Sequence, residues 1–279
     1  ENFLKSFNID VRVRQEVRGI DREAKQLHIQ RLDTGEEYLE DYDKLVLSPG
    51  AEPVRPPIPG INDEAIFTLR SLTNMDAIKG FIDRKDPKRA VIVGAGFIGL
   101  EMAENLHDQG ILVTIVEMAE QVMNVVDYEM AAEVHQHLKT KTVEFYLSDG
   151  VASFSREDGL LNVTLQSGKV IPTDMVILSI GVRPEGRLAR ESGLDVGKLG
   201  GIRVDPHMQT NDPDIYAVGD AIEFPNPITG QPAITYLAGP ANKQGRIVAD
   251  NIAFGNGSQY RGAIGTAVAK VFDLTVATT

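Results

Sequence analysis

Hydrophobic and polar residues are spaced along this chain in a way that predicts alternating strands and helices. The most regular block is Arg89–Val93, a short branched run without polar alternation, typical of a buried strand in a parallel sheet. Apolar residues then recur at helical spacing, at Ile98, Met102 and Leu106, before a second apolar strand at 111–116. The order strand, helix, strand predicts a βαβ unit.

Similar patterns extend to both sides of this unit. Alternation and turn residues predict a strand at 9–13 and two hairpins, at 27–38 and 161–171. A buried strand at 42–47 leads into a glycine turn and a proline-rich linker at 53–59. Three further helices are expected: one opened by a capping box of Thr73 and Asp76, one at 128–139 with Met130, Val134 and Leu138 in the core, and one from Leu237 to Gly255.

A glycine turn, Gly94-Ala95-Gly96-Phe97-Ile98-Gly99, joins the first strand of the βαβ unit to its helix. Gly94 permits a tight turn, Gly96 leaves room for a pyrophosphate beside the backbone, and Gly99 lets the helix approach the strand. The start of the helix offers N–H groups and a positive dipole end to phosphates. The alternative is a glycine turn in some other α/β unit.

The second strand ends in Glu117, about 20 residues after the glycines, where an acidic residue contacts the ribose in dinucleotide-binding folds. A carboxylate at this point can accept both hydroxyls of an adenosine ribose and repels a 2′-phosphate. The turn and Glu117 together predict an NAD(H) site, unless the acidic residue follows the turn by chance.

A second acidic position follows a short apolar strand, Ile215-Tyr216-Ala217-Val218, which ends in Gly219-Asp220. The glycine lets backbone approach a ligand beside the carboxylate, although a solvated Asp at a simple turn is an equal alternative. Leu237-Ala238-Gly239-Pro240 then opens a helix whose N-terminus could stabilise an anionic ligand atom.

Part of the chain repeats at a constant offset of 131 residues. Asp43, Leu47, Ser48, Gly50 and Pro53 return as Asp174, Leu178, Ser179, Gly181 and Pro184. Unless this agreement is chance, it predicts two related nucleotide-binding folds, each a parallel sheet with a β-hairpin excursion. The counterpart of Gly94 would fall before residue 1, so we expect the opening strand, glycine loop and helix of the first fold to be absent from this sequence.

Composition narrows the functional classes. The 279 residues are 42% hydrophobic, and the net charge of −12 disfavours a nucleic-acid or anionic membrane partner. No apolar segment or leader suggests a membrane, so we expect a cytoplasmic protein. Cysteine is absent, which excludes a cysteine nucleophile within these residues. No metal site is proposed, because the five histidines lack ligand spacing and are expected at the surface or an edge: His28, His107, His135, His137 and His207.

Four motifs together resemble the FAD-dependent pyridine nucleotide-disulfide oxidoreductases. They are the glycine loop with Glu101, G-V-R-P at Gly181, I-Y-A-V-G-D ending at Asp220, and L-A-G-P-A-N-K-Q-G-R from Leu237. The likeness runs nearly end to end and, with K-V-F-D-L at 270–274, is nearest to the branch of coenzyme A-disulfide reductases, NADH oxidases and NADH-dependent persulfide or polysulfide reductases. It implies that NADH reduces FAD, which passes electrons to a cysteine.

The resemblance also implies roles for individual residues. Asp220, after Gly219, would hold the ribitol of FAD, Ser48 and Gly50 would lie near its adenosine, and Ala238 would lie near the flavin pyrimidine edge. Gly181 would lie near the nicotinamide nucleotide. As the catalytic pair, Phe97 would cover the flavin until nicotinamide displaces it, and Glu101 would pair with a lysine upstream of residue 1.

The expected fold class is α/β. An NAD(H)-binding domain of Rossmann type at 87–204, with ββα layers, is inserted in an incomplete FAD-binding domain at 1–86 and 205–279, which ends where a dimerisation domain begins. The parent enzyme would be a homodimer that reduces a small disulfide or sulfur compound, with coenzyme A derivatives as candidates, or oxygen. The chain itself would mainly bind dinucleotide. The alternatives are a non-catalytic NAD(H)-binding module and a ferredoxin or rubredoxin reductase.

Overall fold

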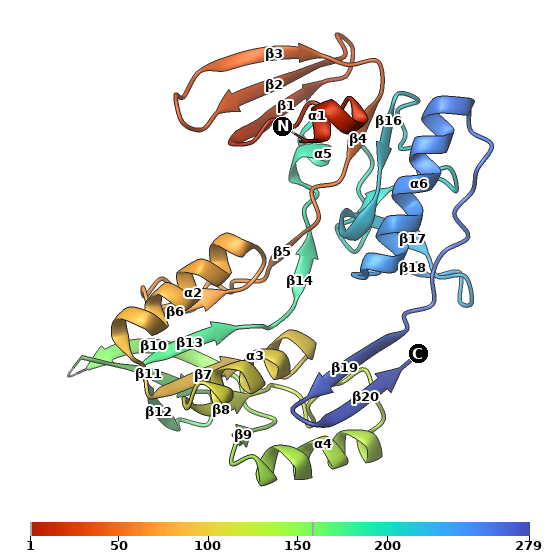
Figure 1. The fold of residues 1–279 in the computed structure, drawn as a ribbon. Helices are drawn as coiled ribbons and strands as arrows, with labels where there is room; N and C mark the ends of the chain where they lie inside the picture. Colours follow the sequence, from red (N-terminus) through yellow and green to blue (C-terminus); the bar gives the residue numbers. More distant parts are fainter. Residues whose placement is uncertain (1, 158) are drawn as a thin grey trace. The chain divides into compact units, whose positions relative to one another are not determined.

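The structure, a computed structural model, describes residues 2–157 and 159–279 and contains two compact units (Figure 1). Unit 1 comprises residues 1–51 and 184–264, and unit 2 comprises residues 52–183 and 265–279. These boundaries differ from the predicted ones at 87 and 204. The difference arises because residues 52–86 add a strand and a helix to the sheet of unit 2, whereas residues 184–204 pack within unit 1.

Unit 2 is built on a five-stranded parallel sheet. Its order is β6 (Ile66–Thr68), β13 (Met175–Leu178), β7 (Arg89–Val93), β8 (Leu112–Val116) and β9 (Glu144–Tyr146). The two central strands, β7 and β13, are buried over almost their whole length, as their continuous apolar sequences predict. The predicted βαβ unit is therefore confirmed, with β7 at the predicted residues.

Helices and an antiparallel meander complete unit 2. The helices are α2 (Leu72–Lys85), α3 (Phe97–Asp108) and α4 (Tyr128–Thr140), and the meander strands are β10 (Val151–Glu157), β11 (Leu160–Leu165) and β12 (Val170–Thr173). One core joins all three layers, with Ile92 from the sheet, Leu106 and Leu138 from the helices, and Leu161 from the meander. This arrangement confirms the expected α/β class with a hairpin excursion from the sheet.

Helix details correct several predictions. Ser71 and Asn74, not Thr73 and Asp76, form the capping box of α2, because the helix begins two residues earlier than expected. In α3 the buried face consists of Gly99, Leu100, Ala103 and Leu106, so Ile98 faces outward and is 39% exposed. In α4 Met130 is exposed, while Ala131, Val134 and Leu138 are buried. The registers of both faces are set by the sheet on which the helices pack.

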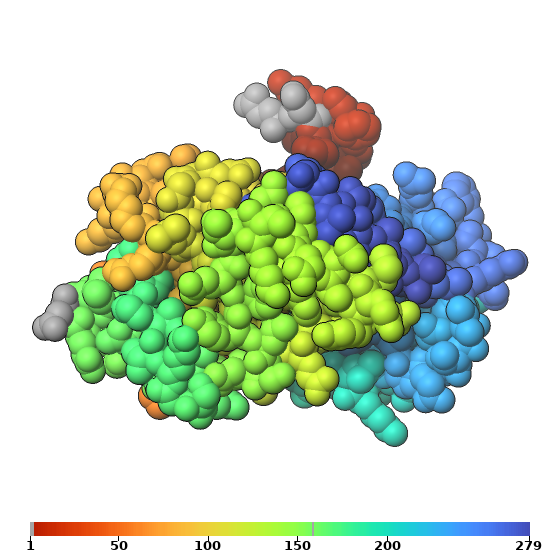
Figure 2. Space-filling view, turned by 90° about the horizontal axis from the view of Figure 1, so that it is seen from below, coloured from red at the N-terminus to blue at the C-terminus, as the bar shows by residue number. Residues whose placement is uncertain are grey.

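A hairpin at the end of the chain packs on the helices of unit 2. Its strands are β19 (Ala267–Val271) and β20 (Leu274–Thr278), and in Figure 2 the dark blue hairpin lies against the yellow-green surface of α4. The Phe272 N–H donates to Glu104 of α3 at 2.9 Å, and Asp273 pairs with Lys141 at 2.7 Å. The motif K-V-F-D-L thus makes the contacts that hold the hairpin to this unit.

Unit 1 contains shorter elements. A meander of β1 (Gln15–Asp21), β2 (Gln26–Arg31) and β3 (Glu37–Asp41) precedes β4 (Leu45–Leu47), which pairs in parallel with β16 (Ile215–Ala217). The remaining elements are α1 (Asn2–Phe7), α5 (Arg187–Glu191), β15 (Ile202–Arg203), η1 (Gly219–Ala221), β17 (Ile222–Pro225), β18 (Pro232–Ala233) and α6 (Ala238–Phe254). The predicted strand at 9–13 is wrong: these residues pair with no described strand and are exposed on both faces.

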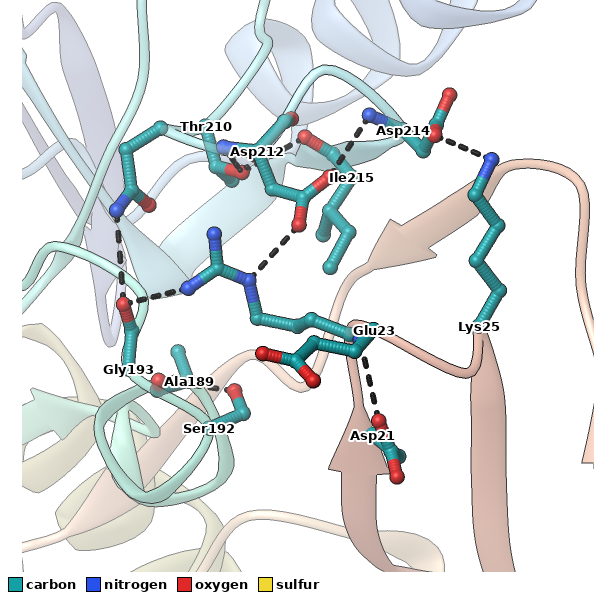
Figure 3. A network of polar contacts seen from close by, with 12 residues as sticks. Asp21, Glu23, Lys25, Ala189, Ser192, Gly193, Thr210, Asp212, Asp214 and Ile215 are labelled. Carbon is teal, nitrogen blue, oxygen red and sulfur yellow. Dashed lines mark hydrogen bonds and ion pairs between the residues drawn. The ribbon is translucent and has the colours of Figure 1, made fainter.

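Ion pairs fasten the meander of unit 1 to the segment before β16 (Figure 3). Arg22, in the turn between β1 and β2, contacts the Asp212 carboxylate at 2.8 Å and donates to the Gly193 carbonyl at 2.9 Å. Lys25 pairs with Asp214 at 2.5 Å. Residues about 190 positions apart in sequence are thereby held together next to the strand that leads to Asp220.

The repeat predicted from sequence is visible in the backbone. The Val54 N–H donates to the Gly181 carbonyl at 3.0 Å, and the Glu185 N–H donates to the Gly50 carbonyl at 2.9 Å. The two donors, Val54 and Glu185, lie 131 residues apart, and so do the two acceptors, Gly50 and Gly181. Each donor bonds to the acceptor of the other copy. These glycines precede β5 (Ala51–Pro53) and β14 (Val182–Pro184), which pair with each other. The symmetric bonds support two copies of one module.

We expect Ile92→Ala to lower the free energy of unfolding of unit 2 by about 2–5 kcal/mol, because Ile92 is fully buried in the central strand. Calorimetric unfolding of both proteins checks this value. The matched control is Leu112→Ala on the neighbouring strand β8, where the side chain is 66% exposed and the cost should stay below about 1 kcal/mol. Equal losses for the two variants would contradict the described core.

Candidate functional site

The glycine turn of unit 2 depends on two close approaches of backbone. Gly94 has a φ of +102°, and a Cβ there would lie 2.4 Å from the Ser179 carbonyl oxygen. A Cβ on Gly99 would lie 2.0 Å from the Gly94 carbonyl oxygen. A side chain fits at neither position without a shift of backbone, so these glycines set the tight turn and the close packing of α3 on β7.

Gly96 differs from the other two glycines because space lies beside it. A Cβ built on Gly96 has no atom within 4 Å, and its φ of −77° is open to any residue. Gly96 is exposed and is the N-cap of α3, a helix of 12 residues. The free volume therefore adjoins the N–H groups of a helix start, where a phosphate group is stabilised by hydrogen bonds and the helix dipole.

The Glu117 carboxylate is bonded to the glycine turn. Its Oε2 accepts the Ala95 N–H at 2.7 Å, and its Oε1 accepts the Ala119 N–H at 2.9 Å. Glu117 follows β8, next to β7, so the carboxylate and the turn share the carboxyl edge of the sheet. Each carboxylate oxygen retains further acceptor capacity, which ribose hydroxyls can use.

Two more hydrogen bonds hold the turn. The Met123 N–H donates to the Ala95 carbonyl at 2.9 Å, and the Gly94 N–H donates to the Val116 carbonyl at 2.8 Å. Met123 is buried and has a φ of +50°, which is uncommon for a residue with a side chain. Neither Met123 nor Ala119 is predicted from the sequence, because both act through backbone groups that no side-chain motif marks.

The other predicted residues of unit 2 lie on the elements that meet at this edge. Phe97 is half-buried against the core, Ile98 is partly exposed, and Glu101 is exposed on α3. Gly181 follows β13, is exposed and has a φ of +105°. The structure thus places all four in the unit that carries the glycine turn, while the catalytic roles of Phe97 and Glu101 stay predictions.

In unit 1 the predicted FAD residues line one open hollow of about 690 Å³. Ser48 and Gly50 come from the segment after β4, Gly219 and Asp220 from the turn after β16, and Ala238 from the start of α6. Segments from three parts of the chain therefore converge at this hollow. Gly219 has a φ of +76°, and its N–H donates to the buried Gln244 side chain at 2.7 Å, which fixes the turn.

Two charged side chains line this hollow, Asp220 and Arg246. Burial raises the pKa of the Asp220 carboxyl above its usual value. Tyr236, which also lines the hollow, has a pKa raised mainly by burial and further by the Asp220 charge. Tyr236 is not predicted from the sequence, because it lies just before the helix motif that begins at Leu237.

A larger hollow of about 990 Å³ lies elsewhere in unit 1, along the meander. Its two arginines are already paired: Arg22 contacts Asp212, and Arg18 contacts Glu16 and Gln30. None of the predicted site residues lines it, and we assign it no role.

The described residues contain no group of three or more His, Asp or Glu side chains that could hold a metal ion. No described helix is both long and apolar enough to cross a membrane.

The chain is similar to known proteins over nearly its whole length. The family model described as pyridine nucleotide-disulphide oxidoreductase matches residues 3–245. The chain is 36% identical to an NADH oxidase of Methanocaldococcus jannaschii, over 99% of the chain and 61% of that protein. The chain therefore spans about three fifths of the length of this relative.

Two solved structures are similar over 99% of this chain. One is reduced Bacillus anthracis CoADR-RHD, with 52% identity, a TM-score of 0.95 and 49% of that chain covered. The other is a NAD-dependent persulfide reductase from A. fulgidus, with 39% identity, a TM-score of 0.94 and 50% covered. Both the expected fold and the branch that the motifs suggested are confirmed.

We expect Gly96→Val to abolish NAD(H) binding and leave the fold intact. The added side chain enters the open space beside the start of α3, where the pyrophosphate would lie, while the backbone angles of Gly96 are compatible with valine. Isothermal titration with NADH measures the loss, and circular dichroism tests the fold.

Gly257→Val is the matched control, since Gly257 in unit 1 also has room for a side chain. It should bind NADH as tightly as the unchanged protein does. A folded Gly96→Val protein with unaltered affinity would show that the dinucleotide lies elsewhere.

Proposed function

Because the chain belongs to the pyridine nucleotide-disulphide oxidoreductase family, we propose that it is the dinucleotide-binding part of an NADH- and FAD-dependent oxidoreductase that reduces a disulfide or sulfane-sulfur compound. The observation that carries this proposal is the glycine turn with Glu117 bonded across it. Such an edge offers N–H groups to a pyrophosphate and a carboxylate to a ribose at the same time.

The NAD(H) site would use unit 2. Gly96 and the first turn of α3 would face the pyrophosphate, and Glu117 would accept hydrogen bonds from the ribose hydroxyls. Gly181 and Phe97 would lie toward the nicotinamide end. The fit rests on the space beside Gly96 and on the acceptor capacity that Glu117 retains at the same edge of the sheet.

The FAD site would use the hollow of unit 1. Asp220 would accept hydrogen bonds from the ribitol, Ser48 and Gly50 would contact the adenosine part, and the start of α6 at Ala238 would face the flavin ring. The donor set fits a polar, hydroxyl-rich ligand, because a partly buried carboxylate, a backbone turn and a helix N-terminus converge there. When bound, FAD would relay electrons from NADH to the sulfur substrate.

The substrate class and assembly are inferred from relatives. The similar proteins include a persulfide reductase, a coenzyme A disulfide reductase and an NADH oxidase, so persulfide, polysulfide, coenzyme A disulfide and oxygen are the acceptors to test. We propose a cytoplasmic homodimer for the whole protein. Glu101 would be a catalytic residue near the flavin, a role that its exposed position on α3 leaves sterically open.

We expect NADH to bind about tenfold or more tightly than NADPH. Placing a 2′-phosphate beside the Glu117 carboxylate sets two negative charges together, at a cost on the order of 1–3 kcal/mol. Titration calorimetry with both cofactors measures the preference. Glu117→Gln should narrow it, and Glu120→Gln, which removes an exposed acid three residues on, should not. Tighter binding of NADPH by the unchanged chain would overturn the ribose assignment.

The proposed reaction is tested on the polypeptide encoded by the whole gene. We expect a yellow protein that oxidises NADH when coenzyme A disulfide or a persulfide is supplied, measured by the loss of NADH absorbance. An Asp220→Ala protein should bind flavin more weakly, because the ribitol loses its carboxylate acceptor. Reduction of ferredoxin with no activity toward any sulfur acceptor or oxygen would assign the protein to another reaction.

A further inference from the structure

One buried histidine, His135, is connected to the glycine turn through backbone hydrogen bonds. His135, on α4, is 8% exposed, although the sequence analysis expected all five histidines at the surface or an edge. Its ring stacks on Phe145 at 5.3 Å between centroids and meets Tyr128 edge-on at 6.4 Å. Its Nε2 lies 3.2 Å from the Val122 backbone nitrogen, which donates its hydrogen. A surface role is therefore wrong for this histidine.

This hydrogen bond requires neutral His135. Nε2 can accept the Val122 hydrogen only when it carries no proton of its own, so the ring proton sits on Nδ1. Burial lowers the pKa of His135, and the charge of Lys139 on the same helix lowers it further. The other groups around the ring are the Phe145 ring from β9, the Tyr128 ring, and the Val122 amide.

The turn that His135 holds is the one that holds the glycine loop. Val122 is followed by Met123, and both side chains are buried. Met123 keeps a φ of +50° and donates its N–H to the Ala95 carbonyl at 2.9 Å. A residue other than glycine keeps a positive φ only when its surroundings fix it. The hydrogen bond from the Val122 amide to His135 is one such restraint.

The Ala95 carbonyl belongs to the same rigid peptide as the Gly96 N–H. Because a trans peptide is planar, fixing its C=O also fixes the direction of its N–H. Met123 thus aims the Gly96 amide, which adjoins the open space at the start of α3. The Ala95 N–H, in the preceding peptide, is held by Glu117. Both peptides of the turn are therefore oriented before a ligand arrives.

We propose that His135 is a positioning residue of the dinucleotide site, which through the Val122 and Met123 amides holds the Ala95 peptide in its binding orientation. The proposal rests on the proposed NAD(H) function of the glycine turn. It also makes dinucleotide affinity depend on pH. We call the path from His135 through the Val122 and Met123 amides to the Ala95 carbonyl the relay. Above the pKa of His135 its first hydrogen bond is intact. As pH falls through that value, the protonated ring can no longer accept the Val122 hydrogen.

Three variants separate the relay from simple packing. His135→Gln keeps a carbonyl acceptor, His135→Leu keeps bulk without an acceptor, and His137→Gln changes a histidine two residues along that contacts Asp273 instead. NADH affinity is measured by calorimetry between pH 5 and 8 for each protein. The ligand-free exchange rates of the Ala95, Gly96 and Met123 amides are measured alongside by NMR.

We expect the unchanged protein and His137→Gln to lose about fivefold to tenfold in NADH affinity as pH falls. His135→Gln should bind tightly with little pH dependence. His135→Leu should bind weakly at every pH and exchange its Met123 amide faster, because the Val122 donor is left buried without its partner.

The two readouts distinguish failure of this proposal from failure of the proposed function. NADH binding that is tight and equally pH-dependent in all four proteins would overturn the role of His135. Unchanged exchange of the Ala95, Gly96 and Met123 amides in His135→Leu would overturn it too, whether or not NADH binds. If the unchanged chain does not bind NADH and the Met123 amide of His135→Leu exchanges faster, the proposed NAD(H) function is wrong. The role of His135 in holding the turn would then still be supported.

Discussion

The hydrogen bond between the Glu117 carboxylate and the Ala95 amide is the interaction on which the candidate dinucleotide site depends. It joins the ends of two adjacent parallel strands, β7 and β8, whose register is fixed by their buried apolar residues. Since the carboxyl ends of parallel strands share one edge, a glycine turn after one strand and an acid after the next must meet. The pairing of β7 with β8 therefore brings the glycine turn and Glu117 within hydrogen-bond distance. The turn contributes N–H donors, and Glu117 contributes a carboxylate acceptor.

Two residues outside the glycine motif, Ser179 and Met123, also hold the turn. Ser179 lies within hydrogen-bond distance of the Val93 and Gly94 carbonyls, at 3.0 and 2.9 Å, and Met123 bonds to Ala95. These partners come from the end of β13 and from the segment before α4, two separate parts of the chain. A loop fixed in this way loses little conformational freedom when a ligand binds, which favours tight binding with few direct contacts.

An element or residue could be predicted from the sequence where neighbouring residues alone determine it, and could not where distant parts of the chain do. Strand β7 was predicted to the residue, because a branched apolar run beside a glycine turn has few other uses. Residues 9–13 alternate just as clearly, yet a strand also needs a neighbour, and alternation says nothing about one. His135 and Met123 were missed for the same reason: one is buried by Phe145 and Tyr128, and the other acts through its backbone, so only the fold reveals them.

The internal repeat shows why equal residues need not have equal roles. Gly50 and Gly181 accept matching hydrogen bonds across the offset, so the backbone of the two copies agrees. Ser48 and Ser179 also correspond, but Ser179 packs against the glycine turn, whereas Ser48 lines the hollow that contains Asp220. The surroundings differ because β13 has strands on both edges, while β4 has only β16 beside it among the described strands. Ser179 therefore supports the backbone of the glycine turn, and Ser48 lines the candidate cofactor hollow. The repeated sequence alone does not predict this difference.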